Sequence, residues 1–106
     1  MYVLVRFEVA EFERWKEAFD DRAAVRAEHG CRGGSVFTRA DSDRKVVLLA
    51  EWDDTDRAQE YFDSAEFRRA MTDAGVQRKP DVTVLEDAGE IPVELDDSEE
   101  DDERDD

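Results

Sequence analysis

Four stretches of this chain carry the apolar pattern of β-strands. In "YVLVRFEV" the apolar side chains Val3, Val5 and Phe7 occupy every second position. A period of two is that of a strand with one buried face. The stretch "KVVLLAEW" is apolar at consecutive positions, which is typical of a strand buried on both faces. Strands are therefore predicted over residues 2–9, 34–40, 45–52 and 81–86.

The segments between these strands repeat their apolar positions with the helical period. In residues 11–29, Phe12, Trp15 and Phe19 follow one another at spacings of three and four, which places them on one helical stripe. Gly30 is the predicted C-terminal cap of that helix. Two further helices are predicted, separated at Asp63 and Ser64, over residues 53–62 and 65–74.

The order of these elements, β-α-β-β-α-α-β, predicts an α+β fold of the ferredoxin-like type. The β-α-β first half matches the β-α-α-β second half in the split manner of that fold. A right-handed crossover places the first and third strands side by side in the middle of a four-stranded antiparallel sheet. The helices then all lie on one face of the sheet, and the other face is bare.

The bare face of the predicted sheet is apolar. The third strand directs Val47 and Leu49 toward it, and the first strand adds Leu4. Burial contributes about 25 cal/mol per Å² of apolar surface, so leaving several such side chains in water is unfavourable. We therefore expect the same face of a second copy to cover it about a two-fold axis, which predicts a homodimer.

Charge divides the chain into two parts. Residues 87–106 contain 12 acidic residues and one arginine, a net charge of −11, which leaves −5 of the total of −16 for residues 1–86. The end of the chain, "LDDSEEDDERDD", has little apolar surface to bury and carries repelling carboxylates. The sequence therefore predicts one folded domain over residues 1–86 and a disordered acidic tail over residues 87–106. Such a tail solubilises the protein or, alternatively, binds a basic partner.

Composition narrows the class of protein. The chain has 12 Arg, 3 Lys and no Asn, and abundant carboxylates with scarce lysine favour adaptation to concentrated salt, a halophilic source. The net negative charge disfavours nucleic-acid binding. No apolar run is long enough to span a membrane, and no secretory signal is apparent, so a cytoplasmic location is expected.

The stretch "RAEHGCRGG", residues 26–34, holds the chain's one histidine and its one cysteine. His29, at a helix C-terminus, is either a charged residue stabilised by the helix dipole or a general acid or base at a pocket mouth. Cys31 is either a small hydrophobic residue at the start of a strand or a thiol activated by Arg32. One histidine and one cysteine make a poor metal site, so no metal is expected. The glycines do not form a dinucleotide-binding loop, because they run from helix to strand.

Five other residues are candidates for ligand binding. Arg6 and Glu8 share a strand face, where they either pair with each other or across a dimer, or hold an anionic substrate. Trp52 and Tyr61 are either core residues or an aromatic wall for a planar ligand. Glu51 is a candidate base only if it is buried.

The motifs "FERWKEAF", "VVLLAEWDD" and "SAEFRRAM", together with this element order, resemble the dimeric α/β-barrel superfamily, most closely the small proteins similar to antibiotic-biosynthesis monooxygenases. The resemblance covers residues 2–86. It implies two four-stranded sheets that meet as a barrel across a dimer, with a pocket in each subunit between sheet and helices. Some relatives oxidise aromatic polyketides without a cofactor. The heme-degrading pattern is not matched, since it requires an Asn and a His in a later helical segment.

Two functions follow from this resemblance. The first is a dimeric barrel that binds or oxidises an aromatic or apolar small molecule as a cofactor-independent monooxygenase, with the electrons supplied by the substrate. The second is a non-catalytic ligand-binding or assembly module with the same fold. No flavin or nicotinamide motif is present, so no cofactor is expected.

Overall fold

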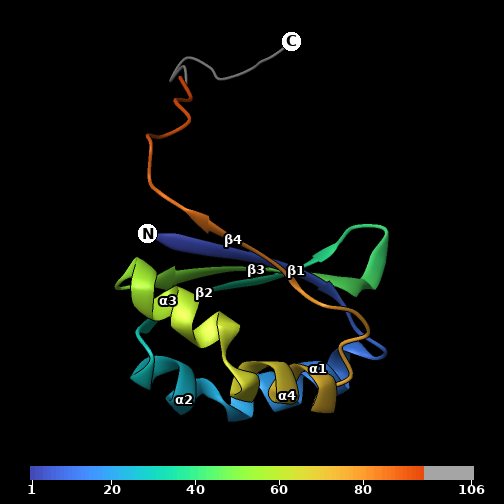
Figure 1. The fold of residues 1–106 in the computed structure, drawn as a ribbon. Helices are drawn as coiled ribbons and strands as arrows, with labels where there is room; N and C mark the ends of the chain where they lie inside the picture. The colour runs from blue at the N-terminus through green and yellow to red at the C-terminus, as the bar shows by residue number, and fades with distance from the viewer. Residues whose placement is uncertain (95–106) are drawn as a thin grey trace.

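The computed structural model describes residues 1–94 as one β-sheet with helices packed against it (Figure 1). The element order is the predicted β-α-β-β-α-α-β, with the first helix divided in two. The elements are β1 (Tyr2–Glu8), α1 (Phe12–Asp21), α2 (Ala23–Glu28), β2 (Cys31–Arg39), β3 (Ser42–Trp52), α3 (Thr55–Asp63), α4 (Ala65–Asp73) and β4 (Asp81–Leu85).

The four strands form one open antiparallel sheet in the order β2-β3-β1-β4. β1 and β3 are the central pair, as the crossover argument predicts. Their register places Leu4 opposite Leu49 and Phe7 opposite Val46. The α+β ferredoxin-like fold is therefore confirmed, with β2 and β4 as the two edges of the sheet.

The helices cover one face of this sheet, and the core lies between the two layers (Figure 1). Alternate residues of the central strands point into that core, where Val3 and Val5 are 0% exposed and Val46 is 1% exposed. Trp15 from α1 and Tyr61 from α3 meet them from the helical side. The period-two pattern thus identifies the buried face correctly.

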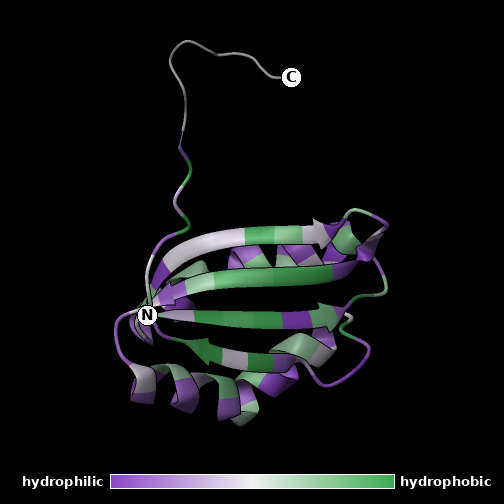
Figure 2. Ribbon diagram, turned by 90° about the horizontal axis from the view of Figure 1, so that it is seen from above, coloured by the Kyte–Doolittle hydropathy of each residue, from purple (hydrophilic) through white to green (hydrophobic). Residues whose placement is uncertain are grey.

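The opposite face of the sheet is not covered by any element of residues 1–94. Figure 2 looks onto this face, and both central strands are hydrophobic along most of their length. Leu4, Val47 and Leu49 are only half-buried there. Phe37 of β2 lies opposite Val47 and is 51% exposed. An apolar surface of this kind is a candidate interface.

The predicted helix over residues 11–29 is two helices that meet at Arg22. The backbone N–H of Arg22 donates to the carbonyl of Phe19, three residues earlier, so the last turn of α1 is tightened. A straight continuation would extend the apolar stripe through Arg22 and Arg26, which are charged. The break lets α2 take a new direction toward β2.

The two later helices begin at side-chain caps, while β2 and β3 each begin three residues before the predicted start. Asp54 accepts a hydrogen bond from the backbone N–H of Arg57 and begins α3, and Ser64 accepts one from Phe67 and begins α4. Residues 87–94 form no helix or strand and are exposed. The rest of the predicted acidic tail, residues 95–106, lies outside the described residues.

Candidate functional site

A cavity of 320 Å³ lies inside the single subunit, between the β2–β3 side of the sheet and the helices. Its volume is within the usual range of small-molecule sites. The elements around it are β2, β3, α1, α3 and α4, together with Arg22 and Arg26 from the α1–α2 junction.

Five aromatic side chains line the helical side of this cavity. The rings of Trp15 and Phe19 are stacked, with centroids 4.8 Å apart and an interplanar angle of 24°. Across from them, Tyr61 and Phe67 have centroids 5.4 Å apart, and Phe62 packs edge-on to both. The helical stripe that builds the core thus also presents flat rings to the cavity, a surface suited to a planar apolar ligand.

Two glycines of β2 form part of the sheet side of the cavity. Gly33 and Gly34 have φ angles of 110° and 151°, and the register of β2 against β3 shifts between Cys31 and Gly33. A β-carbon on Gly34 would lie 2.2 Å from the carbonyl oxygen of Leu49. Only glycine permits this close approach, so "GCRGG" serves a bulge in the strand.

The polar end of the cavity is formed by Arg22, Arg26 and Tyr61. The guanidinium carbon of Arg26 lies 3.6 Å from the centroid of the Phe19 ring, and its Nη1 donates to the Phe19 carbonyl at 2.7 Å. Arg22 Nη2 lies 3.4 Å from Glu66 Oε2. These contacts hold two positive charges beside aromatic walls.

Burial and charge act in opposite directions on two of these groups. Burial raises the pKa of the Tyr61 phenol, and the neighbouring Arg26 and Arg22 partly oppose that rise. Burial also lowers the pKa of the Arg26 guanidinium, with Tyr61 and Cys31 acting the other way. Tyr61 is therefore a neutral hydrogen-bond donor and acceptor at physiological pH, next to two cationic groups.

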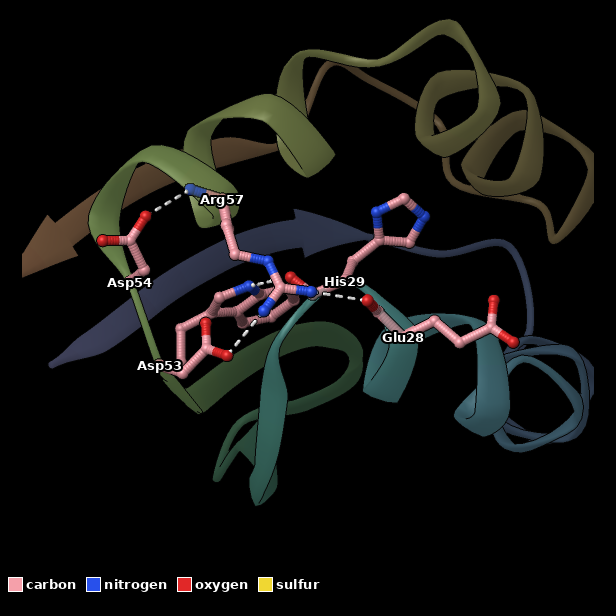
Figure 3. Close-up of polar contacts among 6 residues, drawn as sticks. Glu28, His29, Asp53, Asp54 and Arg57 are labelled. Carbon is pink, nitrogen blue, oxygen red and sulfur yellow. Dashed lines mark hydrogen bonds and ion pairs between the residues drawn. The ribbon is translucent and has the colours of Figure 1, made fainter.

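The stretch "RAEHGCRGG" is the junction between α2 and β2, and the carbonyl groups of Glu28 and His29 accept side-chain hydrogen bonds there (Figure 3). Arg57 donates to the Glu28 carbonyl at 2.6 Å and to Asp53 Oδ2 at 2.8 Å. Trp52 Nε1 donates to the His29 carbonyl at 2.8 Å. The backbone N–H of Asp53 donates to the Gly30 carbonyl at 3.0 Å. The end of α2 is thus tied to the start of α3.

The site residues predicted from the sequence do not lie together in the structure. Tyr61 lines the cavity. Trp52 is 2% exposed in the core, with its ring 5.5 Å from Tyr61. The His29 imidazole points away from Arg57 and its hydrogen-bond partner Asp53 (Figure 3). The centroid of the imidazole ring lies 5.1 Å from that of the Tyr61 ring.

The remaining predicted residues lie on the bare face of the sheet, away from the cavity. Arg6 forms an ion pair with Asp81 of the neighbouring strand β4. Glu8 is half-buried opposite Lys45, and Glu51 is exposed. Their side chains therefore face the surface on which a second copy is expected, and their roles in ligand binding stay predictions.

Arg22 and Arg26 were not predicted from the sequence as site residues. Their spacing of four on a helical segment, in line with Trp15 and Phe19, is the signal that could have identified them. A charged residue on an apolar helical stripe indicates either a break in the helix or a polar group beside a cavity. Here the helix breaks at Arg22, and both arginines line the cavity.

Residues 1–94 show neither a membrane-spanning helix nor a metal-binding cluster. None of their helices is long and apolar enough to cross a membrane. This part of the chain also lacks any group of three or more His, Cys, Asp or Glu side chains arranged to hold a metal ion. Cys31 is a half-buried free thiol on the cavity lining.

Solved structures with the same fold include several oxygenases. SnoaB, a cofactor-independent oxygenase from Streptomyces nogalater, is 20% identical, with a TM-score of 0.61 over 82% of this chain and 93% of that chain. A Mycobacterium tuberculosis protein is 23% identical, with a TM-score of 0.59 over 86% and 97% of the two chains. A Pseudomonas aeruginosa protein is 16% identical, with a TM-score of 0.61 over 83% and 93%. These likenesses establish a common fold.

A search of curated proteins finds no match to this chain. The family model described as antibiotic biosynthesis monooxygenase matches residues 1–73, which include every element from β1 to α4 and all the aromatic residues of the cavity wall. This chain is therefore a member of the antibiotic biosynthesis monooxygenase family.

Proposed function

We propose that this protein binds a planar aromatic small molecule in the cavity of each subunit and oxidises it with O₂ without a bound cofactor. The observation that carries this proposal is the 320 Å³ cavity walled by Trp15, Phe19, Tyr61, Phe62 and Phe67. The family and the printed activity of SnoaB support the choice of oxygen chemistry.

Such a reaction needs a substrate that supplies its own electrons. An aromatic ketone with an activated CH₂ group is a suitable class. One oxygen atom of O₂ becomes the new carbonyl of the product, and the other leaves as water with the two hydrogens of the CH₂ group. The protein would exclude bulk water and hold the enolised ring against the aromatic wall, with Tyr61 as a neutral hydroxyl on the lining.

Oxygen uptake with an anthrone tests this proposal, because an anthrone has a CH₂ group between two aromatic rings. Ala70→Phe fills the cavity from α4, while Ala24→Phe makes the same change on the exposed side of α2. We expect uptake above the protein-free rate for the wild type and Ala24→Phe, and its loss in Ala70→Phe. Equal rates in all three proteins would contradict a role for the cavity.

A second candidate, the non-catalytic binding module, is kept because the acid–base pair on the cavity lining within residues 1–94, Lys16 and Asp20, is exposed and pairs within one helix turn. Binding of the anthrone without oxygen uptake would favour this module over the oxygenase. His29→Ala adds a second measurement, since unchanged turnover would exclude a catalytic role for His29.

We also propose that the protein is a homodimer joined through the bare face of the sheet. The half-buried Leu4, Val47 and Leu49 beside the exposed Phe37 support this interface. Light scattering should give twice the subunit mass of 12.2 kDa. Phe37→Asp should yield monomers, whereas Thr38→Asp, on the other face of the same strand, should not. A wild-type monomer at all concentrations would contradict the dimer.

The remaining parts of the proposal concern the environment of the protein. We propose a cytoplasmic, salt-adapted protein whose domain ends near residue 86 and whose acidic segment, residues 87–106, keeps it dispersed in concentrated salt. The net charge of −16 supports this assignment. Removal of residues 96–106 should leave ligand binding unchanged and should reduce solubility at high KCl concentration.

A further inference from the structure

The polar end of the cavity carries positive charge that the acidic groups around it do not fully neutralise. Arg22 lies at the α1–α2 junction and Arg26 lies four positions later in α2, and both line the cavity. Their positions are unusual in a chain with a net charge of −16. Buried guanidinium groups are unfavourable unless they are paired and hydrogen-bonded.

The two arginines differ in how their donors are satisfied. Arg26 donates to the Phe19 carbonyl at 2.7 Å and lies over the Phe19 ring. Arg22 Nε and Nη2 are buried from solvent and make no hydrogen bond within residues 1–94. A guanidinium has five N–H donors in a fixed planar arrangement, and the Nε–Nη2 edge is one that binds both oxygens of a carboxylate. The neighbours of that edge are the Glu66 carboxylate, 3.4 Å from Nη2, and the Tyr61 phenol, and neither forms a well-aligned hydrogen bond with Nε or Nη2, so the edge keeps donor capacity for a ligand.

The acidic groups near this end do not neutralise it. Asp20 lines the cavity, but Lys16 Nζ donates to both of its carboxylate oxygens, at 2.7 and 2.8 Å. Glu66 approaches Arg22 only to 3.4 Å, and its side chain is 53% exposed. Burial raises the pKa of the Tyr61 phenol, which is therefore neutral at physiological pH, so the two guanidinium groups leave the local charge positive.

We infer that the ligand of this cavity is an aromatic carboxylate, with its ring system among the aromatic walls and its carboxylate on the Nε–Nη2 edge of Arg22. This inference rests on the proposed ligand-binding function of the cavity. Arg26 adds positive charge at the same end, and the Tyr61 hydroxyl is a further neutral donor. The side chain of Glu66 moves away from Arg22 when the ligand binds.

Calorimetric titration with 2-naphthoate and its neutral isostere 2-naphthamide tests this inference on the full chain. The wild type should bind 2-naphthoate about tenfold or more tightly than 2-naphthamide, because hydrogen bonds to charged groups are the stronger class. Arg22→Met should remove this preference and leave 2-naphthamide affinity unchanged. Arg22→Lys keeps the charge without the planar edge, so it should restore only part of the preference.

The control variant is Arg69→Met, which makes the same charge change on the exposed side of α4, outside the cavity. It should keep the full preference for the acid. Equal wild-type affinities for acid and amide would overturn the carboxylate inference while leaving the cavity proposal intact. Binding of neither compound would overturn both. The comparison of the two probes on the wild type decides the matter even if an Arg22 variant does not fold.

Discussion

Phenylalanine side chains are buried on one face of the sheet and exposed on the other. Phe7 of β1 is 8% exposed, with its ring centroid 5.2 Å from that of Trp15 under the helices. Phe37 of β2 is 51% exposed on the bare face. Both lie in strands, so local propensity does not separate them. The difference indicates that the face under the helices forms the core of the subunit, whereas the bare face is available for association.

Replacement of the two phenylalanines by alanine should give the largest contrast. Phe7→Ala creates a cavity in the core and should lower the free energy of unfolding by about 3–5 kcal/mol. Phe37→Ala removes a largely solvated ring and should change the unfolding free energy of the monomer by about 0.5 kcal/mol or less. Urea denaturation at low protein concentration measures both.

A large loss of monomer stability in Phe37→Ala would contradict the separation of the two faces. It would mean that the bare face is packed within the subunit. A concentration-dependent midpoint in the wild type, absent from Phe37→Ala, would instead support association through that face.

Two glycines of β2, Gly33 and Gly34, offer a second comparison, on the side of the sheet that lines the cavity. Gly34→Ala places a β-carbon 2.2 Å from the Leu49 carbonyl oxygen, whereas Gly33→Ala meets no atom within 4 Å. Both positions have positive φ, so both variants carry backbone strain of about 1–3 kcal/mol. We expect the Gly34 variant to lose clearly more stability in thermal denaturation, and equal losses would show that strain alone matters.

The covered face should also respond to alkaline pH through Tyr61. Its pKa is raised in the folded state by burial. Below pH of about 10 both states keep the proton, and above it the unfolded chain releases it first. Stability should therefore fall as the pH rises above that point. Tyr61→Phe should lose part of this dependence, as measured by denaturant midpoints at two pH values; an unchanged slope would contradict it.

The smallest effect is expected on the bare face, at the ion pair between Arg6 and Asp81. Their side chains are 59% and 57% exposed, and exposed pairs contribute about 0–1 kcal/mol. Arg6→Gln should change monomer stability by no more than that. If Arg6→Gln weakens dimerisation in light scattering more than it lowers the free energy of unfolding of the monomer, Arg6 lies at the interface between subunits.

The candidate site could be predicted only in part. Tyr61 was singled out with Trp52 as one of two large aromatics that bracket a loop and helix, either as core residues or as a wall for a planar ligand, and it lines the cavity while it is 4% exposed. The sequence did not identify Arg22 and Arg26, because their inclusion depends on the break between α1 and α2. Conversely, Arg6 and Glu8 have the chemistry of an anion site but lie on the opposite face of the sheet.

By itself, the sequence determined the order of strands and helices except for the break between α1 and α2, the central pair of strands, the buried face and the apolar character of the bare face. These properties follow from local periodicity and from the handedness of crossovers, which depend on neighbours along the chain. Only the tertiary structure decided that two glycines bend β2 beside a cavity, and that two arginines and a tyrosine share its polar end. Those contacts join residues far apart in the chain, so their distances depend on how the helices pack on the sheet.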